Sequence, residues 1–279
     1  MSLLMPETKA PLRPSLAELA TSDRPTDDAA AQEAVNLQSR ILYLRSYLLE
    51  RAIIGFIGVS LPVVIIAGDN LLRTDGPVVR NSLSAYYYSG MRDFFVGSLF
   101  AVGLFLITYK IFERTLNNVL TAIAGVAAFL VAFFPTDRTP TETVGLTPIQ
   151  SHLGERTVSH IHYTSAGVFI VSLAIISFFF GVQEGRRSSQ RAGCRARMSP
   201  AFWRWFHWAC ATVTLLAVAF TVLATRNRMF HGYSLLIGES IAVVAFGLSW
   251  LFKGLELDVL KGPRSARRRW TREVAAENP

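Results

Sequence analysis

Residues 233–252 read YSLLIGESIAVVAFGLSWLF, a long apolar run in which Glu239 is the only charged side chain. An α-helix rises about 1.5 Å per residue, so a helix of this length spans the roughly 30 Å hydrocarbon core of a bilayer. A helix on the surface of a soluble protein has a polar face, and this run has none. The run therefore predicts a transmembrane helix.

The same pattern recurs along the chain. Five more apolar segments qualify as spans: Ala52–Gly68, Phe94–Tyr109, Thr115–Phe134, Ile161–Val182 and Trp205–Ala224. The first two are short in their uncharged part, so spanning length brings Glu50, Arg51, Arg92 and Asp93 to the membrane boundary. Charged residues make up 17% of the chain, against about 25% in soluble proteins. The sequence predicts an all-α fold, a polytopic transmembrane bundle of six helices, and excludes a disulfide scaffold and an ordinary cytosolic enzyme.

The distribution of positive charge predicts the orientation, because Lys and Arg are retained on the cytoplasmic side. With six spans, the segments richest in Lys and Arg fall on one side: Arg40–Arg51, Lys110–Arg114, Arg186–Arg204 and Lys253–Arg272. An odd number of spans would separate the two richest segments. We therefore expect both termini in the cytoplasm and a multi-pass protein of the cell membrane.

The sequence divides into three predicted parts. Residues 1–40 form a tail that is disordered at first and interfacial towards its end, 41–255 form the six-helix domain, and 256–279 form a basic cytoplasmic tail. The net charge of +8 comes mainly from the cytoplasmic loop and this tail, which indicates attraction to anionic lipid. A nucleic-acid role is excluded, because stacking aromatic residues on a folded module are missing. A homo-oligomer is left open.

Ionisable residues inside a membrane usually face a bundle interior or a wet cavity. On the predicted topology most of them lie in the outer half, and Glu239 lies roughly 9 Å inside the bilayer by helix rise. Asp93 shares a helix face with Gly97 and Ala101, a small-residue pattern that allows close helix packing. A second stripe of small residues lies beside Glu239: Gly238, Ala242, Ala245 and Ser249. The sequence predicts an outward-facing polar pocket formed by Ser84, Tyr87, Arg92, Asp93, His162 and Glu239.

Three of these residues also have a purely structural interpretation. Asp93 can pair with Arg92 or Arg80 at the interface, and His162 can be a hydrated residue at a helix start. Glu239 can hydrogen-bond a Tyr, Ser or His of a neighbouring span. The sequence alone leaves these alternatives open.

Three segments resemble a widespread bacterial family of six-helix integral membrane proteins of unknown function. They are Ser82–Gly97 (SLSAYYYSGMRDFFVG), Ala124–Asp137 and Glu239–Gly254 (ESIAVVAFGLSWLFKG), and the likeness covers roughly Leu44–Gly254. The family combines a Ser-x-Ser-x-Tyr-Tyr run and an Arg-Asp pair with a Glu-Ser pair and a Phe-Gly-x-Ser-Trp-Leu-x-Lys-Gly ending. It is remotely similar to membrane proteins that include DRAM-type autophagy modulators and GPI-lipid remodelling factors. The resemblance implies an uncharacterised protein of the bacterial inner membrane.

A second comparison is with the alkaline ceramidase and adiponectin-receptor superfamily, seven-helix proteins that hold zinc with three His. Asp93, Ser84 and His162 match residue types of that site, but its late His-x-x-x-His pair is missing and Glu239 stands there instead. This resemblance implies an alternative in which Asp93, His162 and Glu239 hold zinc.

Three functions remain open on the sequence, and whether the protein is an enzyme is undecided. The first is a membrane protein without a cofactor, whose polar pocket binds a lipid headgroup, a proton or a small solute. The second is a metal-dependent hydrolase of lipid amides or esters, in which a metal-bound water attacks. The third is a structural or assembly protein.

Overall fold

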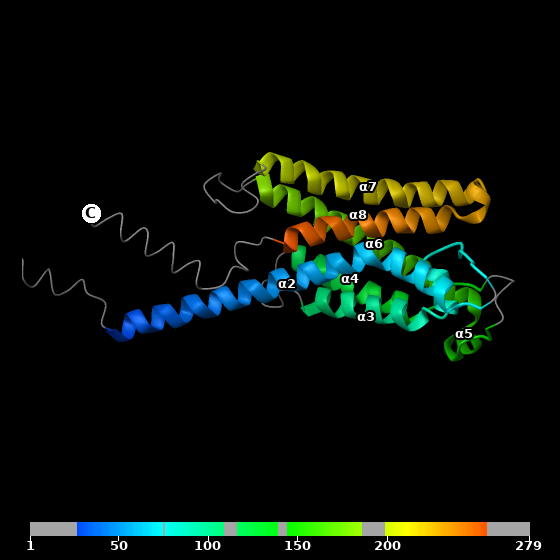
Figure 1. Cartoon of the computed structure of the whole chain (residues 1–279), viewed down its shortest axis with the longest axis horizontal. Coiled ribbons are helices and arrows are strands. Elements are labelled where there is room, and N and C mark those ends of the chain that lie inside the picture. The colour runs from blue at the N-terminus through cyan, green and yellow to red at the C-terminus, as the bar shows by residue number, and fades with distance from the viewer. Residues whose placement is uncertain (1–26, 75, 109–115, 139–143, 186–198, 256–279) are drawn as a thin grey trace, which may run out of the picture. The chain divides into compact units, whose positions relative to one another are not determined.

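The computed structural model describes residues 27–74, 76–108, 116–138, 144–185 and 199–255. These residues form seven α-helices and two short 3-10 helices, and they contain no strand (Figure 1). In chain order the elements are α2 (Asp27–Leu72), η1 (Ser84–Tyr88), α3 (Arg92–Thr108), α4 (Leu116–Phe133), α5 (Pro148–Leu153), α6 (Glu155–Gly185), α7 (Pro200–Arg226), η3 (Phe230–Gly232) and α8 (Ser234–Gly254). The predicted all-α fold is confirmed.

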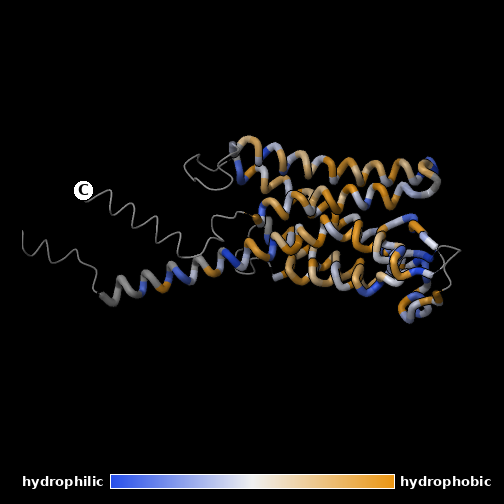
Figure 2. The backbone as a smooth tube through the Cα atoms, viewed as in Figure 1, coloured by the Kyte–Doolittle hydropathy of each residue, from blue (hydrophilic) through white to orange (hydrophobic). Residues whose placement is uncertain are grey.

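Four of the helices are long and apolar enough to cross a membrane: Arg45–Leu72 within α2, Glu155–Glu184, Ala201–Arg226 and Ser234–Gly254. Asn118–Phe133 in α4 is apolar but shorter. Apart from the end residues Phe134 and Tyr233, the described parts of all six predicted segments are helical. Apolar residues run along these helices, and hydrophilic residues gather near their ends and in the loops (Figure 2).

The chain divides into two compact units, Met1–Leu44 and Arg45–Pro279. Of the first unit, the structure describes only the helical residues 27–44. The predicted disorder of the N-terminal tail therefore lies almost wholly outside the described residues, and the basic tail 256–279 lies entirely outside them. The cavity and the ionic contacts described below all belong to the second unit.

Within the second unit, α6 packs against α4, α7 and α8, and α3 packs against α4 (Figure 1). The contact between α2 and α8 depends on glycine. A Cβ atom at Gly247 would lie 2.7 Å from the backbone nitrogen of Val59, and one at Gly55 would collide with the backbone of Leu251. Small residues let helices approach this closely. The predicted stripe Gly238, Ala242, Ala245 and Ser249 is buried as expected.

The predicted packing face of α3 is wrong. Asp93 and Gly97 are exposed, and no described atom lies within 4 Å of a Cβ built at Gly97. The helix instead buries Phe95, Leu99, Val102, Gly103 and Leu106. Burial of large apolar side chains outweighs the smaller gain from packing Gly97, so Asp93 and Gly97 turn away from the bundle.

Candidate functional site

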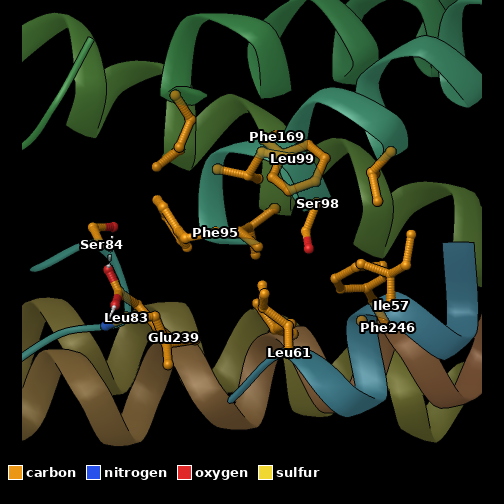
Figure 3. A pocket seen from close by; sticks show the side chains of 16 residues that line it. Ile57, Leu61, Leu83, Ser84, Phe95, Ser98, Leu99, Phe169, Glu239 and Phe246 are labelled. Atoms are coloured by element: carbon orange, nitrogen blue, oxygen red, sulfur yellow. Dashed lines mark hydrogen bonds between the residues drawn. The ribbon is translucent and has the colours of Figure 1, made fainter. Parts of the chain in front are cut away.

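A cavity of about 80 Å³ lies among the helices of the second unit (Figure 3). Residues of α2, α3, α4, α6 and α8 line it, together with Leu83 and Ser84 at the start of η1. Its walls are mainly aliphatic and aromatic, and its polar lining side chains are Ser84, Ser98 and Glu239. This volume exceeds the roughly 10–15 Å³ that one water molecule requires, so the cavity has room for a small guest.

Glu239 lies at the edge of this cavity, close to the start of α8. Its carboxylate accepts a hydrogen bond of 2.6 Å from the backbone N–H of Leu83 and one of 3.4 Å from the hydroxyl of Ser84 (Figure 3). The first N–H groups of a helix have no partner within the helix, so the carboxylate caps the N-terminus of η1. The backbone N–H of Leu236 also donates to the carbonyl of Asn81, at 2.9 Å. These contacts fix the segment before α3 on α8.

The same segment is held from two other sides. Arg80 forms a buried ion pair of 3.3 Å with Asp69 near the end of α2. The hydroxyl of Tyr88 donates to the carbonyl of Thr136 at 2.5 Å, and the side-chain amide of Gln150 donates to Tyr88 at 2.7 Å. Burial raises the pKa of Tyr88 to about 12, so this phenol stays a donor at neutral pH. All five residues of η1 are buried, and its first residue, Ser84, lines the cavity.

The six predicted pocket residues are distributed over several contacts. Ser84 and Glu239 come together at the cavity. Tyr87 and Arg92 form a separate pair, in which Arg92 donates to the Tyr87 hydroxyl at 2.8 Å and stacks on its ring. His162 is buried, and its Nδ1 lies 2.6 Å from the carbonyl oxygen of Phe134. Asp93 is exposed at the start of α3. Neither His162 nor Asp93 lines the cavity.

The chemical character of this cavity follows from the side chains that line it. The described residues that line the cavity include no His, Cys or Lys. Within the described part of the chain, no three His, Cys, Asp or Glu side chains are grouped to hold a metal ion. The alternative zinc set Asp93, His162 and Glu239 is therefore not gathered in one place. What the cavity offers a guest is apolar contact, two hydroxyls and a carboxylate oxygen.

A second polar cluster, which sequence reasoning missed, lies near the other end of α8. Lys253 forms a buried ion pair of 2.5 Å with Glu184 at the end of α6. The ring of Phe180 is near both cations: its centroid lies 5.9 Å from the Lys253 nitrogen and 4.6 Å from the guanidinium carbon of buried Arg51. Nearby, Nδ1 of His207 lies 2.9 Å from the hydroxyl of Ser249. In the sequence these charges look like ordinary boundary residues, and no local signal pairs them.

Comparisons of this chain with family models, with curated proteins and with solved structures found no match. The resemblance to six-helix bacterial membrane proteins therefore stays a prediction. The helices define the class of protein: it is an α-helical protein whose apolar helices are compatible with membrane integration.

Proposed function

We propose that the chain is an integral protein of the cell membrane that crosses it six times, with both termini in the cytoplasm. Four helices of spanning length support this, together with the shorter helices α3 and α4. An even number of spans keeps the basic segments on one side, as the retention of positive charge requires. The basic loop Arg186–Arg204 and the basic tail 256–279 then lie on the cytoplasmic side, where anionic lipid headgroups attract positive charge.

The function we propose is binding of a small, mainly apolar molecule whose hydrogen-bond donor meets Glu239. The observation that carries the proposal is the apolar cavity with this carboxylate at its edge. Ligand sites are typically apolar with a few placed polar groups that orient the ligand. A molecule with an apolar chain and an alcohol or amine group at one end matches that lining. Lipid-like amphiphiles and some small solutes have this structure.

Photolabelling with an octanol that carries a diazirine tests this function on the purified full-length protein. We expect adducts on cavity residues such as Leu99 and Phe169, read by mass spectrometry of peptides. Ser98→Phe fills the cavity and should remove these adducts, whereas Val168→Phe, on an exposed face of α6, should keep them. Ser98→Leu is a milder filling variant if Ser98→Phe does not fold. Equal labelling of the filled variants and wild type would contradict the proposal.

A second candidate is a structural role, which the hydrogen bonds of Glu239 favour. The carboxylate already accepts hydrogen bonds from Leu83 and Ser84, and in this second candidate its role is to hold η1 in place. The photolabelling experiment separates the two, because a purely structural role predicts no adducts in the cavity. No arrangement among the described residues favours the metal-dependent hydrolase.

A further inference from the structure

An open polar hollow of about 520 Å³ lies where α6 begins, and it shares no lining residue with the cavity. Its lining comes from the residues that follow α4 and from the first turns of α6: Asp137, Arg138, Glu155, Arg156, Ser159, His160 and Tyr163. Positions 156, 159, 160 and 163 lie on one face of an α-helix. One side of α6 therefore turns four polar side chains towards the segment after α4.

The formal charges of the residues that line this hollow sum to zero, but two of the charged side chains form no ion pair with another described residue. Arg138 forms an ion pair with Glu155, in which Nε of Arg138 lies 3.1 Å from Oε1 of Glu155. Arg138 also donates a hydrogen bond to the carbonyl of Val144. This pairing raises the pKa of Arg138 and keeps it cationic. Asp137 and Arg156 are exposed, and neither forms an ion pair with another described residue. The hollow thus presents one available anion and one available cation.

The position of the hollow along α6 indicates which region of a bilayer it faces. It lies at the first residues of the candidate span Glu155–Glu184, where a bilayer has its polar headgroups. Because the formal charges of the lining cancel, a net anion would meet as much repulsion as attraction. A neutral zwitterion instead matches both free charges.

We propose that this hollow binds a zwitterion with a phosphate and a primary ammonium group, the phosphoethanolamine group of a lipid or of a free solute. Asp137 accepts hydrogen bonds from the ammonium group, and Arg156 donates to the phosphate, the pairing that guanidinium geometry favours. A quaternary ammonium group has no N–H to donate and is bound best by a cage of Trp, Tyr or Phe rings, whereas Tyr163 is the one residue of these three types in this lining. The proposal shares only the membrane placement with the proposed function.

Native mass spectrometry of the full-length protein in detergent tests this site with three lipids of identical chains. Their headgroups are phosphoethanolamine, phosphocholine and phosphoglycerol. We expect the phosphoethanolamine lipid to bind about tenfold more tightly than the other two, as one charge-assisted hydrogen bond predicts. Asp137→Asn should remove its advantage over the phosphocholine lipid, and Arg156→Gln should weaken it about tenfold.

The matched controls are Asp93→Asn and Arg226→Gln, which neutralise exposed charges outside the hollow and should bind like wild type. Free phosphoethanolamine added as a competitor distinguishes the two sources: displacement assigns the site to the headgroup alone, and retention assigns it to the whole lipid. Unchanged binding in both hollow variants, or equally tight binding of the phosphoglycerol lipid, would overturn the proposal. Ser98→Phe should leave this lipid binding unchanged, so the proposal for the hollow and the proposal for the cavity can be contradicted independently.

Discussion

At the scale of single residues, Glu239 joins two parts of the chain that are far apart in sequence. Its carboxylate accepts from the backbone of Leu83, 156 residues earlier, and from the Ser84 hydroxyl. A buried donor that loses its acceptor costs more than the hydrogen bond itself contributes, because the donor also lacks water. Glu239 therefore stabilises η1 as well as giving the cavity its carboxyl group.

Replacing Glu239 should lower the free energy of unfolding, and more so when the new side chain has no hydrogen-bond acceptor. Glu239→Gln keeps an acceptor oxygen, so we expect a decrease in the free energy of unfolding of about 1 kcal/mol or less. Glu239→Leu leaves the Leu83 N–H without an acceptor, and we expect a decrease of about 1–3 kcal/mol. The measurement is unfolding of the purified protein in mixed detergent micelles, with the exposed substitution Ile241→Leu as control. A Leu variant as stable as wild type would show that the hydrogen bond is not stabilising.

Sequence reasoning predicted Glu239 and Ser84 in one polar pocket and offered a Ser as a hydrogen-bond partner of Glu239, but it did not predict the backbone N–H of Leu83. An uncharged run around a single carboxylate is visible in the sequence. Which backbone N–H donates to that carboxylate depends on how the segment before α3 folds. No periodic pattern in the sequence predicts the buried η1. The contacts of Tyr88 with Thr136 and Gln150 were missed for the same reason.

At the scale of elements, glycine determines which helices touch closely. Gly55 and Gly58 of α2 face Gly247 of α8, so the two backbones approach without side chains between them. Gly103 of α3 similarly faces the carbonyl of Gly125 in α4, 3.0 Å from a Cβ built there. Gly97, in contrast, faces no described neighbour. A small residue permits close packing, but the sequence does not show whether a second helix is present.

This difference gives a paired prediction. Gly247→Ala places a methyl group against the backbone of α2, and we expect a loss of about 1–3 kcal/mol in the free energy of unfolding, the usual cost of overpacking. Gly97→Ala adds the same methyl group in open space within a helix, where alanine is favoured by about 0.5–1 kcal/mol. Unfolding measured under identical conditions compares them, and the account fails if the two variants shift stability in the same direction by similar amounts.

At the scale of the whole molecule, the second unit places different polar groups at the two ends of α8. Near its start lie Glu239 and η1, and near its end lie Lys253 and Glu184. Removing one partner of a buried ion pair leaves a costly charge, so the Lys253–Glu184 pair favours one arrangement of α6 against α8. The helical segments were predictable because apolar runs of this length are unmistakable. The pairing at either end was not, since it depends on helix rotation.

The orientation of the chain remains the claim on which the function depends most. In the orientation we propose, η1, Glu239 and the polar hollow lie towards the outer leaflet and the basic segments lie in the cytoplasm. These placements follow from the retention of Lys and Arg and from an even number of spans. Cysteine accessibility measures them directly.

The decisive measurement uses a membrane-impermeant maleimide on intact and permeabilised cells, with Cys194→Ser and Cys210→Ala as background. New cysteines are introduced singly as Gly145→Cys, in the exposed segment before α5, and as Ser2→Cys and Glu277→Cys near the termini. The account predicts that the cysteine at position 145 reacts in intact cells, and that those at 2 and 277 react only after permeabilisation. Labelling of positions 2 and 277 on opposite sides, or protection of position 145 in intact cells, would contradict it.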